Sequence, residues 1–199
     1  KAIKASGYEA GKDVFVCIDT ASSELFNEHK YILQGEDKHL NPGEMISYLK
    51  TLTSKYPINS IEDGLDEDDW EGWKSLTQTL GSEVQLVGDD LFATNRERIK
   101  RGIEESVANS VLIKMNQIGT ISETLEAVAL SQENGYKTII SHRSGETEDT
   151  SIADLAIGLA AGQIKTGAPS RTDRVSKYNR LIILEEKFKI PFVGKNEAL

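Results

Sequence analysis

Ionisable residues follow a series of short apolar runs in this sequence, at the point where each run ends. Six runs show this pattern, and the residues at their ends are Asp19, Glu62, Asp89, Lys114, His142 and Lys165. Buried parallel strands read as continuous apolar runs, and α/β barrel enzymes carry their chemistry where such strands end. We therefore expect three acids, two lysines and a histidine to face one cleft. The alternative is a set of ordinary polar loop residues.

The three acids would supply hard oxygen ligands from neighbouring strands. Mg²⁺ is held by a few carboxylates together with waters and substrate oxygens, which suits Asp19, Glu62 and Asp89. The competing interpretation is three unrelated surface or loop acids. His29 and His39 lie in a polar stretch and read as solvated residues, so no His/Cys set indicates zinc.

The two lysines follow apolar runs and would be partly enclosed. Burial and nearby cations lower the pKa of a lysine, which a lysine base requires. The competing interpretation is that Lys114 and Lys165 form salt bridges with the same acids. A metal-carboxylate cluster beside a lysine base suits removal of a weakly acidic proton next to a carboxylate.

The loop after Thr138–Ser141 carries a histidine, an arginine, a serine and a glycine. Arg143 has the forked guanidinium that binds a phosphate or carboxylate, and the amides around Ser144 and Gly145 suit an anion. His142 would move a proton or hydrogen-bond a substrate. We expect this loop to hold an anionic group.

The spacing of the strand-end residues indicates repeated βα units. From Glu62 to Lys165 the five positions are separated by 27, 25, 28 and 23 residues, enough for one strand, one helix and two loops each. Such repeats predict a parallel sheet, either open and doubly wound or part of an eightfold barrel. No glycine-rich nucleotide-binding motif follows a strand, and the charged strand ends favour the barrel.

Several local signals predict the helices. Asn41 with Glu44 and Thr120 with Glu123 have the spacing of N-terminal capping boxes. The residues expected to face inward are Ile46, Leu49 and Leu52 in one helix, Trp70, Trp73, Leu76 and Leu80 in the next, Ile121, Leu125 and Val128 after Thr120, and Val175, Tyr178, Leu181 and Ile182 in the last. Tyr31–Leu33 reads as a short extra strand, and the tail from Pro191 onward reads as irregular.

Composition limits the class of protein. The chain has 199 residues, a formal net charge of -9, 28% charged and 38% hydrophobic residues, which predicts one globular domain over 1–199. The acidic balance argues against direct nucleic-acid binding. Neither a membrane span nor a signal peptide is visible. Cys17, the single cysteine, reads as a small core residue, and Lys1–Lys4 reads as mid-helix, so we expect a piece of a longer protein.

Four runs of sequence resemble the enolase family. They are Ser60-Ile61-Glu62-Asp63-Gly64, Leu112-Ile113-Lys114-Met115-Asn116-Gln117-Ile118-Gly119, Ser141-His142-Arg143-Ser144-Gly145-Glu146-Thr147-Glu148-Asp149 and Gly162-Gln163-Ile164-Lys165-Thr166-Gly167. The second and third are highly specific, and the resemblance covers essentially the whole chain. It implies the C-terminal part of a TIM-type (β/α) barrel, about six of its eight strands, without the N-terminal α+β domain of enolases.

The resemblance implies magnesium-dependent interconversion of 2-phosphoglycerate and phosphoenolpyruvate, with roles carried over by motif. Asp19, Glu62 and Asp89 resemble the Mg²⁺ ligands, and Glu62 and Asp89 also border the substrate. Lys114 resembles the base that removes the C2 proton, and Lys165 the partner of the substrate carboxylate. Arg143 and Ser144 resemble the phosphate-binding residues, and His142 a catalytic contact near the leaving hydroxyl. This lysine base with magnesium is itself the standard example of the superfamily's chemistry.

One departure from the family pattern has consequences for activity. The motif holding the general-acid glutamate of enolases, of the type Gly-Asp-Glu-Gly-Gly, does not occur here. We therefore expect little or no turnover by these 199 residues alone, whereas the full-length enzyme should be an active, cytoplasmic, homo-oligomeric lyase of glycolysis. The alternative is a non-catalytic binding role in an RNA-degrading assembly or as a secreted, cell-surface plasminogen receptor.

Overall fold

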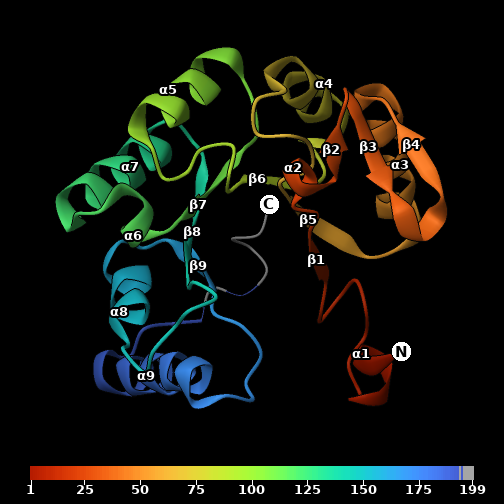
Figure 1. Cartoon of the computed structure of the whole chain (residues 1–199). Coiled ribbons are helices and arrows are strands. Elements are labelled where there is room, and N and C mark those ends of the chain that lie inside the picture. Colours follow the sequence, from red (N-terminus) through yellow and green to blue (C-terminus); the bar gives the residue numbers. More distant parts are fainter. Residues whose placement is uncertain (193, 195–199) are drawn as a thin grey trace. The chain divides into compact units, whose positions relative to one another are not determined.

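A computed structural model describes residues 1–192 and 194, and its polypeptide divides into two compact units (Figure 1). Unit 1 comprises Lys1–Leu91 with Gly102–Asn109, and unit 2 comprises Phe92–Arg101 with the described residues from Ser110 onward. The expectation of a single domain stays a prediction. The predicted irregular tail from Pro191 lies largely at residues 193 and 195–199, outside the described part.

Unit 1 is built around three parallel strands in the order β1-β5-β6. These strands are β1 (Val16–Asp19), β5 (Ile58–Glu62) and β6 (Gln85–Gly88). The helices are α1 (Ala2–Ala5), α2 (Ser22–Leu25), α3 (Pro42–Lys55) and α4 (Trp70–Leu80). A separate antiparallel sheet contains β2 (Phe26–Asn27), β3 (Lys30–Leu33) and β4 (Lys38–Leu40), with a 3-10 turn at Gln34–Glu36. The predicted extra strand is confirmed as β3.

Unit 2 contains the next three parallel strands, in the order β7-β8-β9. They are β7 (Ser110–Ile113), β8 (Lys137–Ser141) and β9 (Gly162–Lys165). Its helices are α6 (Met115–Ile118), α7 (Ile121–Glu133), α8 (Ser151–Gly158) and α9 (Thr172–Phe188), and α5 (Arg96–Glu105) has residues in both units. In Figure 1 the blue helices α8 and α9 lie side by side, and α8 also packs on β8.

Two predicted helix starts are confirmed by their hydrogen bonds. The Asn41 side chain accepts a hydrogen bond from the amide of Glu44, whose carboxylate accepts one from the amide of Asn41, which completes a capping box. The Thr120 side chain accepts from the amide of Glu123, and its hydroxyl donates to the carboxylate of the same residue. Each cap therefore satisfies backbone groups that would otherwise lack partners in the first turn.

The predicted inner faces of the helices are mostly right in unit 1, where Ile46 and Leu49 of α3 are buried and Leu52 is half-buried, and they are partly wrong in unit 2. In α4 all four predicted residues are buried, and they are Trp70, Trp73, Leu76 and Leu80. In α7, however, Ile121 and Leu125 are exposed, and in α9 Ile182 is exposed. In α7 Val128 is buried as predicted, together with Thr124, Ala127 and Ser131, and the buried residues of α9 are Arg174, Lys177 and Leu184. A helix face is set by its 3.6-residue period, and here that period places small and polar residues on the buried face beside Val128 and Leu184.

Cys17 corrects a further prediction. It was expected in the core because apolar residues surround it in sequence, yet its side chain is exposed on β1. Successive residues of a strand point to opposite faces, and along β1 Val16 and Ile18 are half-buried while Cys17 and Asp19 are exposed. Cys17 therefore shares the exposed face of this strand, where its thiol contacts the side chain of Asn59.

Candidate active site

The predicted acids all lie at the carboxyl ends of the three parallel strands of unit 1. Asp19 is the last residue of β1 and Glu62 the last of β5, and the two are directly opposite in the register of these strands. Asp89 follows β6 at once. Glu62 and Asp89 are each only 7% exposed, whereas Asp19 is exposed. The three neighbouring strands therefore bring three carboxylates together at their carboxyl ends.

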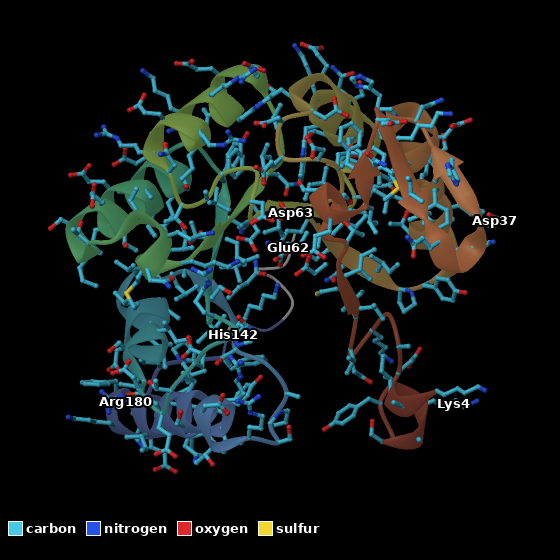
Figure 2. All side chains as sticks on the ribbon, in the orientation of Figure 1. Lys4, Asp37, Glu62, Asp63, His142 and Arg180 are labelled. Atoms are coloured by element: carbon cyan, nitrogen blue, oxygen red, sulfur yellow. The ribbon has the colours of Figure 1, made fainter. Side chains whose placement is uncertain are left out.

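A fourth acid, Asp63, connects the ends of β5 and β6. Its two carboxylate oxygens accept hydrogen bonds of 2.9 Å each, one from the amide of Asp89 and one from the amide of Asp90. The Thr20 hydroxyl donates to its carbonyl oxygen at 2.6 Å. Figure 2 labels Asp63 beside Glu62, and its backbone has a left-handed φ of 45°. Asp63 thus fixes the turn that carries Asp89.

Burial governs the ionisation of Asp63, which is 4% exposed. Burial raises the pKa of Asp63 to about 7, and the charges of Asp89 and Asp90 act in the same direction, while the two amide hydrogen bonds oppose them. Sequence reasoning missed this residue. The available signal was the pair of acidic doublets after neighbouring strands, Glu62-Asp63 and Asp89-Asp90.

The donor set of unit 1 fits a divalent cation that prefers oxygen. Among the described residues, Asp63, Asp89 and Asp90 form a cluster whose carboxylate oxygens lie within 4.8 Å of one another. Asp63 and Asp89 are buried and Asp90 is exposed. Carboxylates this close repel one another when ionised, and a hard cation such as Mg²⁺ relieves this repulsion. The predicted ligand set shares only Asp89 with this cluster, and the assignment of Asp19 and Glu62 as ligands stays a prediction.

The predicted basic residues lie at the strand ends of unit 2. Lys114 follows β7, His142 follows β8, and Lys165 is the last residue of β9. The His142 amide donates to the carbonyl of Lys165 at 2.9 Å, which joins the ends of β8 and β9. The Lys114 amide donates to the buried hydroxyl of Thr94 at 2.9 Å. Both lysine residues are half-buried, as their apolar flanks predicted.

The loop after β8 presents the two predicted anion-binding residues. The Arg143 guanidinium donates to the side chain of Asn116 at 2.8 Å, and the Arg143 amide donates to the Glu146 carboxylate at 2.9 Å. Ser144 and Gly145 are exposed. Arg143 is therefore held at its backbone and at one guanidinium nitrogen. An arginine held in this way suits recognition of a phosphate or carboxylate.

His142 is held in an environment that disfavours its charged form. Burial lowers the pKa of His142, and the positive charges of Arg174 and Lys165 lower it further, while Glu146 and a hydrogen bond with the backbone of Thr166 oppose them. At neutral pH the ring is therefore neutral and suits hydrogen bonding. Sequence reasoning missed Arg174 because hydrophobic spacing assigned other residues to the inner face of α9.

Parallel strands that alternate with helices, with acids and bases at the strand ends, define the α/β class that places chemistry at the carboxyl ends of its strands. Residues 1–198 match the family model described as enolase, C-terminal TIM barrel domain. The chain therefore belongs to the family of enolase C-terminal TIM barrel domains, and the predicted α/β barrel fold is confirmed. Within the described residues, no helix is long and apolar enough to cross a membrane.

Proposed function

We propose that the chain is the catalytic barrel portion of an enolase that interconverts 2-phosphoglycerate and phosphoenolpyruvate. The family match over residues 1–198 carries this proposal, because it covers every strand-end residue discussed above. The finer assignments rest on the sequence motifs and on the strand-end positions of these residues. They are made residue by residue within each unit.

In unit 1 we assign Asp19, Glu62 and Asp89 to Mg²⁺, with Glu62 and Asp89 also bordering the substrate. Bound magnesium would supply positive charge to the oxygens of a substrate carboxylate, which makes the adjacent proton easier to remove. The burial of Glu62 and Asp89 supports this assignment, because buried carboxylates need a compensating charge.

In unit 2 we assign Lys114 as the base that takes the C2 proton onto its Nζ atom. Lys165 would pair with the substrate carboxylate, and Arg143 and Ser144 would hold the phosphate. Neutral His142 would form a hydrogen bond near the hydroxyl that leaves. The positions of both lysines support their roles, because Lys114 directly follows β7, Lys165 is the last residue of β9, and both are half-buried.

The motif that carries the general-acid glutamate of enolases does not occur in these 199 residues. We propose that the 199-residue polypeptide alone removes the C2 proton far more readily than it expels the hydroxyl, and that it has little or no turnover. We also propose that the full-length enzyme is a cytoplasmic homo-oligomer without direct nucleic-acid contacts. The net charge of -9 supports the last point.

Exchange of the C2 proton tests the proposal without needing the general acid. The 199-residue chain is incubated with 2-phosphoglycerate and Mg²⁺ in D2O, and proton NMR follows the C2 signal and any phosphoenolpyruvate. We expect slow loss of the C2 signal without net dehydration, abolished by Lys114→Ala and retained by Lys50→Ala, an exposed lysine of α3. Equal exchange in both variants would contradict the role of Lys114, and full turnover would contradict the missing acid.

A further inference from the structure

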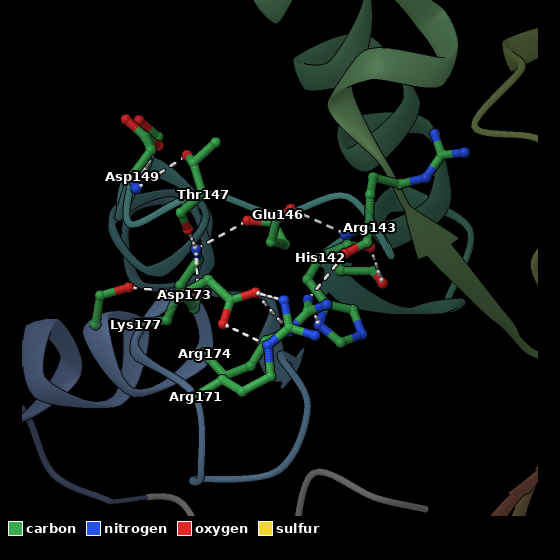
Figure 3. A network of polar contacts seen from close by, with 12 residues as sticks. His142, Arg143, Glu146, Thr147, Asp149, Arg171, Asp173, Arg174 and Lys177 are labelled. Atoms are coloured by element: carbon green, nitrogen blue, oxygen red, sulfur yellow. Dashed lines mark hydrogen bonds and ion pairs between the residues drawn. The ribbon is translucent and has the colours of Figure 1, made fainter.

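Helix α9 contributes two buried cations to the loop that follows β8. Of the residues that the structure describes, Arg174 and Lys177 are the only buried basic ones, with exposed fractions of 9% and 0%. They are three positions apart on one helix, so both side chains emerge from the same face. Figure 3 shows both side chains directed toward the residues from His142 to Thr147.

Arg174 contacts three consecutive residues of this loop. One guanidinium nitrogen, Nη1, lies 2.5 Å from Nδ1 of His142 and donates to the carbonyl of Arg143 at 2.8 Å. The other, Nη2, donates to the carbonyl of Ser144 at 3.1 Å. The approach is close, since a Cβ added at Gly167 would lie 3.0 Å from Arg174 Cδ and 3.1 Å from His142 Cε1. Gly167 thus leaves room for the arginine and the imidazole to meet.

The contact between the two side chains determines where the imidazole carries its proton. An arginine guanidinium has five N–H donors and no acceptor, and it stays protonated at every physiological pH. Nδ1 of His142 must therefore accept the hydrogen bond through its lone pair. In the neutral ring the proton is then on Nε2. The hydrogen bond with the backbone of Thr166 raises the pKa of His142, as donation from a ring N–H to a carbonyl would.

Lys177 secures the other end of the loop. Its Nζ lies 2.8 Å from the carboxylate of Glu146 and donates to the carbonyls of Thr147 at 2.5 Å and Asp173 at 2.6 Å. Glu146 in turn accepts the amide hydrogen of Arg143. Burial opposes ionisation of Glu146, but the hydrogen bonds from Lys177 and the Arg143 amide and the charges of Lys177 and Arg174 outweigh it, so its pKa is lowered.

We propose that Arg174 is a positioning residue that holds His142 as the neutral Nε2–H tautomer and fixes the backbone of Arg143 and Ser144, with Lys177 securing the same loop through Glu146. The imidazole is thereby a hydrogen-bond donor at Nε2 and takes no proton at Nδ1. The importance of this arrangement for catalysis rests on the proposed function. The tautomer itself follows from contacts within unit 2 alone.

The experiment is nitrogen-15 NMR of the imidazole rings in the 199-residue chain, recorded between pH 5 and pH 8 without ligand. His142→Gln identifies the signals of His142, and the exposed rings of His29 and His39 serve as internal references. We expect His142 to show an unprotonated Nδ1 and a protonated Nε2 at pH 7. A ring with its proton on Nδ1, or a doubly protonated ring at pH 7, would overturn the proposal.

Arg174→Gln removes the charge and the forked donor, and Arg174→Lys restores the charge without the fork. We expect a mixture of tautomers and an upward shift of the His142 titration in Arg174→Gln, and a smaller shift in Arg174→Lys. Arg180→Gln removes another arginine of α9, which pairs with Asp154, and should leave the His142 signals unchanged. Unchanged signals in folded Arg174→Gln would contradict the proposal, and if this variant does not fold, the spectrum of the unsubstituted chain still decides the tautomer.

Adding 2-phosphoglycerate with Mg²⁺ separates this inference from the proposed function. We expect the His142 signals to move on addition, and the ligand to bind about tenfold more weakly to Arg174→Lys than to Arg180→Gln, which corresponds to one lost supporting hydrogen bond. If the tautomer is as proposed but no signal moves, the positioning by Arg174 stands and the substrate assignment fails. If signals move but the proton is on Nδ1, the substrate assignment is supported and the proposed positioning by Arg174 fails.

Discussion

The ammonium group of Lys177 lies 2.8 Å from the carboxylate of Glu146, in a place where the lysine has no exposed surface. A buried cation loses its hydration and needs several acceptors in return. Lys177 finds them in Glu146 and in the carbonyls of Thr147 and Asp173. This ion pair therefore ties α9 to the loop that carries the candidate phosphate-binding residues.

Replacing Lys177 by methionine should lower the free energy of unfolding by about 3 kcal/mol, because it leaves Glu146 and two carbonyls without their donor. Chemical denaturation measures this value. Lys187→Met removes an exposed lysine of the same helix and should change it by less than about 0.5 kcal/mol. Adding Glu146→Gln to Lys177→Met should restore part of the loss. Equal, small effects of both lysine substitutions would show that the ion pair contributes nothing to stability.

Asp63 and Asp37 form a matched pair for a second prediction, since both have left-handed backbones, with φ of 45° and 51°. Alanine at either position carries the same backbone strain. Only Asp63→Ala also leaves the amides of Asp89 and Asp90 without acceptors, at about 1–3 kcal/mol for each buried group. We expect thermal or chemical unfolding to show a larger loss for Asp63→Ala than for Asp37→Ala, by at least about 2 kcal/mol. Equal losses would mean that water replaces the carboxylate.

The neutral state of His142 predicts how stability depends on pH. Because burial and two nearby cations lower its pKa in the folded chain below 6.5, the unfolded chain binds more protons than the folded one between these two values. The contribution of His142 to stability is therefore full above about pH 6.5 and is lost as the pH drops through this window. Urea unfolding between pH 5 and pH 8 should show a shallower decline for His142→Gln than for the parent. His39→Gln removes an exposed ring of β4, and its stability should depend on pH as that of the parent does. If the stability of both variants declines equally with falling pH, His142 is not the group responsible.

Substitutions of single acids distinguish the two candidate ligand sets for magnesium. The predicted set includes Glu62 and not Asp90, whereas the cluster of close carboxylates includes Asp90 and not Glu62. We expect Glu62→Gln to weaken Mg²⁺ binding, measured by calorimetry, at least about tenfold. Glu67→Gln alters an exposed acid in the loop after the same strand and should have little effect. A larger loss of Mg²⁺ affinity in Asp90→Asn than in Glu62→Gln would favour the cluster of Asp63, Asp89 and Asp90 as the ligand set.

The strand ends were predictable because the signal for each is local. A short apolar run followed by an ionisable residue marks the end of a strand in the parallel sheet, and Asp19, Glu62, Lys114 and Lys165 lie where this pattern placed them. The cap at Asn41 was predictable for the same reason, because its partners are three residues away. Local patterns of this kind need no knowledge of the tertiary structure.

The residues that sequence reasoning missed depend on partners distant in the chain. Arg174 and Lys177 are buried because carbonyls and a carboxylate about 30 residues earlier in the chain accept their hydrogen bonds. Hydrophobic spacing instead favoured Ile182, which is exposed. Asp63 was missed likewise, since its role depends on two amides at the end of the next strand. Patterns of hydrophobicity carry no information about such acceptors.

The contacts of α9 also set the order in which this region can fold. The loop from His142 to Thr147 obtains three of its backbone acceptor contacts from a helix that begins only at Thr172. Local helices form early, whereas contacts that close a long stretch of chain form later because of their entropic cost. The anion-binding residues can therefore reach their final positions only once α9 has docked on the loop. The amides of this loop should accordingly gain protection from hydrogen exchange together with α9.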